Sequence, residues 1–359
     1  MLVGFGADEI TIALTAAASM LPAVILAPLT GIIIDRIAFK KLMFLLLMTE
    51  IGMTLCFITI NSLEYVWILM LLIFTRSAAA AMLFSAEMTL FSRILEGKML
   101  KNTNEIHSII WSFCYASGMA AGGLITHRMG HDTAFVIDAA LYCIAVILLI
   151  GLQLSSTHID HTDSNWMMFK KGVRYLITQK KILHLILLHA SLGLTSFDAL
   201  VTLLADLRYK EMIAVPLAIG WINATRAAAL IIGPFFIGKW ISKDTLHYFF
   251  LLQALGIMLW ALFEFNFYLS LAAMFVTGFF TTTLWSYTYL LIQEETDKAF
   301  LGRIISYNDM FFMLSNVLTA LFIGYSAKWG LSLEGITLIL GCGFIFAAMY
   351  YLWFKKRYL

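Results

Sequence analysis

Four polar side chains could do chemistry because they interrupt long apolar stretches: Arg76, Asp198, Asn223 and Arg226. A charged side chain at the centre of a membrane costs about 2.5–3.5 kcal/mol on insertion scales, so each charge needs a partner or a function. The chemistry open to such groups is charge pairing, proton transfer and the binding of a polar solute. Arg76 is therefore either a coupling or solute-contact residue, or a helix–helix hydrogen bond of purely structural value.

Asp198 and Arg226 occur in consecutive apolar stretches, 14 and 12 residues from the ends of those stretches at His184 and Gly238. At 1.5 Å per residue their depths differ by ~3 Å, so we expect the two charges to pair. The pair is either static, or it opens when Asp198 takes a proton or a solute binds Arg226. Asn223, one turn before Arg226, is a candidate cavity residue.

The composition requires a solvent other than water for much of the surface. Of the 359 residues, 61% are hydrophobic and 13% are charged, against roughly 45–50% and 25% in soluble domains. A net charge of +2 indicates no nucleic-acid partner. The sequence shows no nucleotide-binding loop, metal-ligand cluster or nucleophile triad, so we expect no cofactor, no metal and no enzymatic activity.

Eleven apolar stretches are long enough to cross a bilayer as helices, which needs ~20 mostly apolar residues. No stretch alternates with the period of a barrel strand, so the sequence predicts an all-α membrane protein. The stretches are approximately 10–34, 42–61, 66–91, 106–126, 134–154, 184–207, 213–238, 246–264, 267–291, 304–327 and 335–354.

The Lys and Arg residues predict the orientation of these spans. With a cytoplasmic carboxyl terminus, 18 of the 24 fall in cytoplasmic segments and 4 in outer loops, namely Arg128, Arg208, Lys210 and Lys328. Positive charge is retained on the cytoplasmic side during insertion. We therefore expect a multi-pass protein of the cell (inner) membrane with its carboxyl terminus in the cytoplasm.

The connection 155–183 divides the spans into five before it and six after it. Its second part is basic and amphipathic, with Trp166, Phe169 and Val173 at helical spacing and Lys170 and Lys171 between them. This pattern predicts a helix on the cytoplasmic leaflet. The predicted organisation is an amino-terminal half (1–154), a cytoplasmic linker (155–183) and a carboxy-terminal half (184–359).

Between the first two spans lies a motif composed of Gly31, Asp35, Arg36, Lys40 and Lys41. It resembles the signature loop of the major facilitator superfamily, Gly-x-x-x-Asp-Arg-x-Gly-Arg followed by two basic residues, although Ala38 and Phe39 replace its second Gly and its Arg. The resemblance implies the major facilitator fold and a loop that closes the inner gate through charge pairs. The alternative is an ordinary basic loop that obeys the positive-inside rule.

Weaker similarities indicate the drug and siderophore exporter branch, which includes enterobactin and macrolide exporters. The position of Arg76 resembles that of the branch's fourth-helix arginine, and Glu50 resembles an acidic residue of its third helix. Asp138 lies in a segment that resembles the branch's Ala-Phe-x-x-Asp-Ala pattern. The branch's antiporter motif has a Gly-Pro pair, and here Gly122 and Gly123 have no proline beside them, which weakens the case for proton antiport. We assign Asp138, near a span end, to packing.

The resemblance implies twelve helices, and this chain has eleven. The motif follows the first span instead of the second, so we expect the family's first helix to be missing, through a misplaced start or a truncation; a natural eleven-helix design is the alternative.

The function implied is a monomeric secondary transporter, a proton-coupled efflux antiporter for a small drug-like or siderophore-like solute in the lipid bilayer. Lysolipid or amphiphile flipping is a second possibility, and a truncated, non-transporting remnant is a third. Trp285 either contacts an amphiphilic solute or packs against its neighbours.

Overall fold

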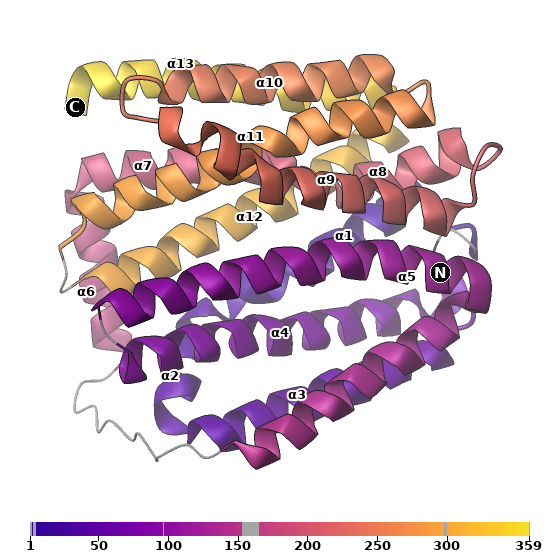
Figure 1. Ribbon diagram of the computed structural model, residues 1–359, viewed down its shortest axis with the longest axis horizontal. Coiled ribbons are helices and arrows are strands. Elements are labelled where there is room, and N and C mark those ends of the chain that lie inside the picture. The colour runs from indigo at the N-terminus through magenta and orange to yellow at the C-terminus, as the bar shows by residue number, and fades with distance from the viewer. Residues whose placement is uncertain (1, 3–4, 96, 153–164, 298–299, 359) are drawn as a thin grey trace.

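The computed structural model describes residues 2, 5–95, 97–152, 165–297 and 300–358, and in these ranges the chain is helical with no strand. Figure 1 shows the helices running nearly side by side. Their bounds are α1 Glu9–Ile25, α2 Ala27–Arg36, α3 Phe39–Cys56, α4 Val66–Ile94, α5 Gly97–Gly151, α6 Asn165–Thr178, α7 Lys180–Ala190, α8 Asp198–Leu204, α9 Val215–Ile237, α10 Leu246–Phe263, α11 Phe267–Glu295, α12 Leu301–Lys328 and α13 Leu333–Tyr358.

All eleven predicted spans fall on helices, which confirms the predicted fold class. Within the described ranges, nine helices are long and apolar enough to cross a membrane, and Glu9–Ile25 is a shorter apolar helix. The span Phe113–Gly151 covers two predicted spans, because α5 turns back at Gly130, where φ is 84°. A glycine adopts this left-handed conformation without a Cβ clash.

Two predicted spans are interrupted. The span 10–34 breaks at Leu26 between α1 and α2, where a proline occupies the first turn of α2 and cannot continue the preceding hydrogen-bond ladder. The span 184–207 ends as α7 at Ala190, passes through a 3-10 turn, Ser191–Thr195, and resumes as α8 at Asp198. Such interruptions free backbone groups that side chains must then satisfy.

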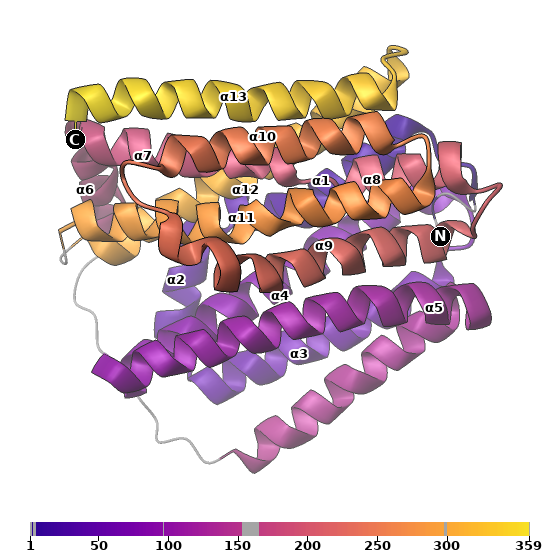
Figure 2. The ribbon, with the colours of Figure 1, turned by 45° about the horizontal axis from the view of Figure 1, so that its top comes forward.

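The bundle has two chemically different ends. We call the end that carries Lys40, Lys181, Lys243 and Lys355 the basic end, and the end at the Gly130 turn the opposite end. Figure 2 shows the carboxyl terminus at the basic end and the amino terminus at the opposite one. There, Asp8 caps α1 by accepting a 2.9 Å hydrogen bond from the Thr11 amide. This bond lowers the pKa of Asp8.

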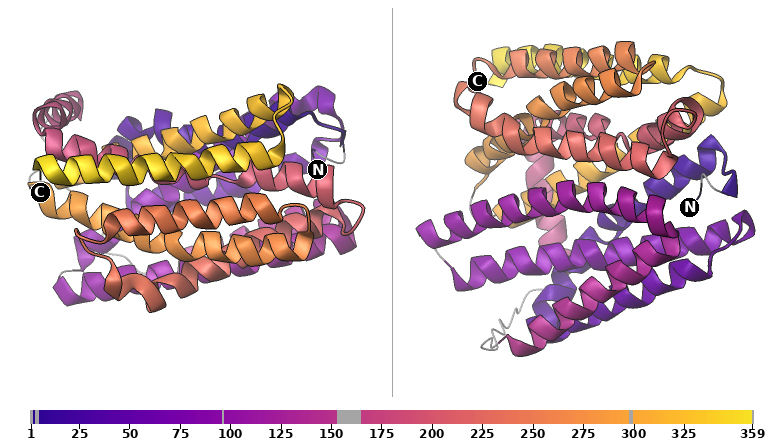
Figure 3. Two further views of the ribbon diagram at one scale, coloured as in Figure 1. Left: turned by 90° about the horizontal axis from the view of Figure 1, so that it is seen from above. Right: turned by 45° about the vertical axis from the view of Figure 1, so that its right-hand side comes forward.

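Helix α6 differs from the others in direction. It is seen nearly end-on in the view in which the other helices lie lengthwise (Figure 3). Tyr175 on α6 stacks on Phe300 at 4.2 Å, and its hydroxyl lies 3.2 Å from the Asp297 carboxylate. The amphipathic segment is thus helical and packs against the α11–α12 connection, while its predicted contact with lipid stays a prediction.

One core lies mainly in the helices after α6, although Ile12 of α1 also belongs to it, and a smaller core lies in α2–α5. The helices before α6 contact those after it chiefly through α1 with α12 and α5 with α9. Glycines bring the backbones together at both crossings. A Cβ on Gly123 of α5 would lie 2.7 Å from the Pro216 carbonyl oxygen and 3.0 Å from the Gly220 Cα of α9. A Cβ on Gly324 of α12 would lie 2.1 Å from the Ala13 Cβ of α1. Both crossings lie toward the opposite end, so the two cores are in closest contact there.

Candidate functional site

Arg76 is the centre of a charge network between three helices. Its Nε donates to Glu50 Oε2 of α3 at 2.9 Å, and its Nη2 donates to Asp138 Oδ2 of α5 at 2.6 Å. The guanidinium also lies 5.9 Å from the Phe57 ring centroid and 5.8 Å from that of Tyr142. The network thus holds one cation between two carboxylates, with aromatic rings on both sides.

The network has room for one more proton. Glu50 is completely buried, and its second oxygen, Oε1, has no hydrogen-bond partner. Two carboxylates that share one guanidinium carry a net negative charge, and burial disfavours that charge. A proton on Glu50 would neutralise the network, which makes Glu50 the chemically suitable proton acceptor.

The structure places Asp138 in this network, and the sequence had suggested only a packing role for it. The sequence indicates the depth of Asp138 in its span, but it does not indicate the direction in which the side chain points around the helix axis. The turn at Gly130 sends the second arm of α5 back alongside α3 and α4, and this return brings Asp138 to Arg76.

A hollow of about 560 Å³ borders the network. Its wall includes Arg76 and Ser77 of α4, Thr15 of α1, Thr202 of α8 and Gly220 of α9. The hollow is therefore lined by helices that precede α6 in the sequence and by helices that follow it, which makes it a candidate solute site.

Asp198 and Arg226 do not form the expected ion pair in this conformation. Arg226 instead donates from Nη2 to the Thr195 carbonyl oxygen at 2.7 Å, and its guanidinium lies 5.3 Å from the Phe197 ring. Asp198 begins α8, where the first backbone N–H groups of a helix lack partners and favour an anion. The helix break that the hydropathy pattern did not show thus gives Arg226 a backbone partner and places Asp198 in the first turn of α8.

Asn223 and Trp285 have different surroundings. Asn223 is 3% exposed, and its amide oxygen has no hydrogen-bond partner. Trp285 of α11 is 38% exposed and stacks on Tyr289 with ring centroids 4.8 Å apart. Asn223 is thus a buried unsatisfied group, and Trp285 presents an accessible ring.

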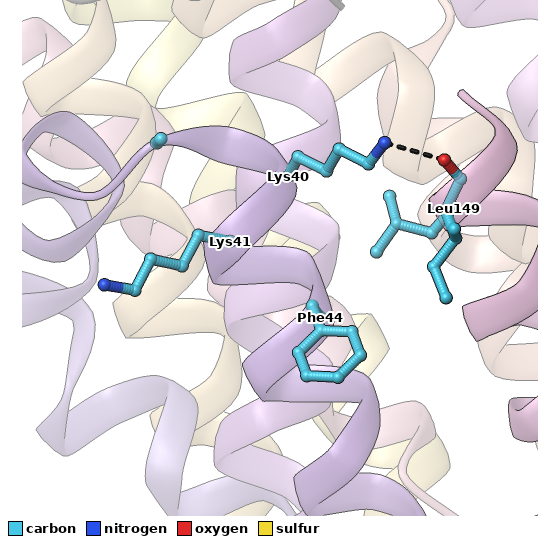
Figure 4. Close-up of a pocket in the computed structure, with 6 residues that line it drawn as sticks. Lys40, Lys41, Phe44 and Leu149 are labelled. Carbon is cyan, nitrogen blue, oxygen red and sulfur yellow. Dashed lines mark hydrogen bonds between the residues drawn. The ribbon is translucent and has the colours of Figure 1, made fainter. Parts of the chain in front are cut away.

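The motif between the first two spans is described only in part, because Gly31 and the side chains of Asp35 and Arg36 lie outside what the structure describes. Figure 4 shows Lys40 reaching toward the end of α5 and Lys41 pointing away from it. Lys40 Nζ donates to the carbonyl oxygens of Ile150 at 2.7 Å and Leu152 at 2.9 Å. A cation is favourable at a helix carboxyl terminus, so Lys40 caps α5 in this conformation.

Two further ionisable residues inside the spans, which no sequence motif indicated, are His189 of α7 and Asp309 of α12. His189 is completely buried and lies against Trp285, while Asp309 is accessible. Both are ionisable residues inside a span, and that signal alone would have found them.

Comparison with known proteins places this chain in a family. A sequence model of the Major Facilitator Superfamily matches residues 1–215. Over 132 residues the chain is 25% identical to the uncharacterized MFS-type transporter YfiS of Bacillus subtilis (strain 168), a match that covers 37% of this chain and 31% of that protein. The chain thus spans about a third of the length of this curated relative.

Solved structures show the same fold. The crystal structure of the nucleoside transporter NupG superposes with a TM-score of 0.71 at 16% identity, covering 100% of this chain and 93% of that one. A mutant of NupG gives 0.71 at 15% identity, covering 99% and 93%. Likeness at this level of identity concerns the fold alone.

Proposed function

Because this chain belongs to the Major Facilitator Superfamily, we propose that it is a secondary transporter that works by alternating access. The proposed activity is export of a small drug-like or siderophore-like solute against inward proton flow. The observation that carries the proposal is the Arg76 network, a buried group with a free carboxylate oxygen beside a hollow between the two cores. Buried ionisable groups of this kind mark ion and solute pathways in membrane proteins.

The conformation supports alternating access. The two cores are in closest contact near the opposite end, at the glycine crossings. Toward the basic end, the first arm of α5 exposes Ile110, Trp111 and Phe113. In the proposed cycle, this state, with the halves touching at the glycine crossings toward the opposite end, alternates with one in which they touch toward the basic end.

Orientation is part of the proposal: the basic end faces the cytoplasm, as the distribution of Lys and Arg indicates. A reporter active only in the cytoplasm should give a signal when fused after Leu359 and none when inserted at 128–132. The reverse pattern of signals would contradict the proposed orientation and, with it, the proposed direction of transport.

Glu50→Gln tests the coupling. The wild-type protein is reconstituted in proteoliposomes that enclose a pH-sensitive dye. A gradient of a transported solute should then drive protons through the protein and change the internal pH. Glu50→Gln keeps an acceptor oxygen for Arg76 and removes the titratable group. We expect this variant to lose proton movement while it still exchanges labelled solute for unlabelled solute.

The matched control is Glu64→Gln, an exposed glutamate in the connection before α4, which should leave both activities unchanged. Proton movement by Glu50→Gln at the wild-type rate would exclude Glu50 as the proton acceptor. A solute exchange that is never coupled to protons, even in the wild-type protein, would contradict antiport itself.

A further inference from the structure

Three side chains of the carboxy-terminal core lie at one depth, and Tyr289 lies one helical turn nearer the end of α11. Trp285 lies ten residues from the end of α11 at Glu295, Asp309 eight from the start of α12, and His189 nine from the start of α7. All three helix ends are at the basic end, and at 1.5 Å per residue the depths agree within about 3 Å. The His189 ring lies 5.5 Å from Trp285, 5.6 Å from Tyr289 and 5.5 Å from Phe312.

The accessible faces of Trp285 and Asp309 point away from the lipid side of their helices. Leu290 on α11 and Leu314 and Leu318 on α12 are exposed apolar residues. With 3.6 residues per turn, Leu290 lies about 140° around the helix from Trp285, and Leu314 and Leu318 lie about 140° and 180° from Asp309. Asp309 is accessible although protein atoms surround it closely. Both side chains therefore line an inner surface of the bundle.

The hydrogen bonds of His189 determine which ring nitrogen is bare. Thr288 Oγ1 gives its proton to the Leu284 carbonyl oxygen at 2.8 Å, so it accepts the 2.8 Å bond from His189 Nδ1. The other nitrogen, Nε2, is then an acceptor, and it is buried without a partner. A buried acceptor without a donor is costly, and a ligand that supplies a donor removes that cost.

The charge of the cluster is negative, and the described residues provide no counter-charge. Asp309 accepts from the amide of its neighbour Asn308 at 3.2 Å, and no described Lys, Arg or His side chain forms an ion pair with it. Its carboxylate is close enough to Tyr289 for an electrostatic interaction. The negative π faces of Trp285 and Tyr289 attract cations as well. The bare His189 Nε2, the Asp309 carboxylate and the two ring faces are thus suited to a donor or a cation.

We propose that Trp285, Tyr289, His189 and Asp309 form a subsite for a planar aromatic solute that carries a positive charge. The solute's ring stacks on Trp285, and its charge lies near Asp309. This inference rests on the proposed transport function, because it specifies the solute class for the same pathway. Stacking supplies shape selection, and the unpaired carboxylate supplies charge selection.

Ethidium, a planar aromatic cation, is a suitable probe. Its binding to the purified full-length protein in nanodiscs is measured by fluorescence anisotropy, with empty nanodiscs as background. Adenosine, which is planar and uncharged, and tetraethylammonium, which is charged and not planar, serve as competitors. We expect saturable ethidium binding. Each competitor should bind at least about tenfold more weakly than ethidium, a difference of ~1.4 kcal/mol in binding free energy.

Variants separate the two contributions. Asp309→Asn should weaken ethidium binding at least about tenfold while it leaves adenosine competition unchanged, and Trp285→Ala should weaken both. Asp309→Glu and Trp285→Phe keep the charge and the ring, and they should retain binding. The controls are Leu290→Ala, on the lipid side of α11, and Asp132→Asn, beyond the Gly130 turn; both should bind ethidium as the wild-type protein does.

The outcomes distinguish this subsite from the function on which it rests. Unchanged ethidium affinity in Asp309→Asn, or adenosine binding as tight as ethidium binding, overturns the cationic subsite. A loss of binding in Asp309→Glu equal to that in Asp309→Asn, with both variants folded, also overturns it. Ethidium that binds as expected and is never transported leaves the subsite standing and contradicts transport. Proton-coupled movement of another solute by a protein that does not bind ethidium supports the transport function and overturns the subsite.

Discussion

Replacing Arg76 with Gln should reduce both folded protein and transport, the latter at least about tenfold. The change leaves the completely buried Glu50 carboxylate without its cation, and removing one partner of a buried pair typically costs about 3–5 kcal/mol. Thermal unfolding in detergent and solute exchange in proteoliposomes measure the two effects. Arg128→Gln, an exposed arginine before the Gly130 turn, is the matched control and should change neither.

Two further variants test the geometry of the network. Arg76→Lys keeps the charge, but a single ammonium cannot reproduce the guanidinium that reaches Glu50 through Nε and Asp138 through Nη2. We expect it to transport poorly. The double variant Arg76→Gln with Glu50→Gln removes both charges, so it should unfold at a higher temperature than Arg76→Gln alone and still fail to couple protons. Normal stability and transport in Arg76→Gln would show that the network has no role in the mechanism.

Replacing Gly123 with Val should abolish most transport by separating the halves at the opposite end. The new Cβ would lie 2.7 Å from the Pro216 carbonyl oxygen and 3.0 Å from the Gly220 Cα. Both are backbone atoms, so α5 and α9 must move apart. Overpacking of this kind costs about 1–3 kcal/mol. It destabilises the state in which the halves touch at that end. We expect solute exchange to fall at least about tenfold.

Gly52→Val on α3 is the control, because a Cβ at Gly52 meets nothing within 4 Å and Gly52 does not line the hollow. It should transport as the wild-type protein does. A cysteine introduced at Val215, in the wall of the hollow, should react with a membrane-impermeant thiol reagent faster in Gly123→Val than in the wild-type protein. Equal transport by the two valine variants would contradict closure through the glycine crossing.

Part of the charge network was predictable, and its completion was not. Arg76 and Glu50 were singled out, one as an ionisable residue inside a span and the other through the family resemblance. The depth of a residue in a membrane helix follows from its position in the sequence. Its direction around the helix axis depends on which neighbours the helix packs against, so the meeting of Arg76 with Asp138 became visible only in the structure.

Asp198 and Arg226 illustrate the same division. Their similar depths were read correctly as proximity, since Arg226 contacts Thr195 and Phe197, the residues just before Asp198. The expected partner was wrong because the helix is interrupted between Ala190 and Asp198. An apolar stretch shows no such break in its hydropathy, and the freed carbonyl of Thr195 takes the place that the carboxylate was expected to fill.

The sequence by itself determined the all-α membrane class, the eleven apolar helices and the family, because hydropathy and the signature motif are local properties of the chain. The three-part organisation, the orientation and the missing first helix stay predictions. Only the tertiary structure decided which charges meet, where the halves touch, and that His189 lies beside an accessible tryptophan with Asp309 near Tyr289. These contacts depend on helix rotation, helix breaks and backbone approach at glycines, and none of these is encoded in the polarity of a single segment.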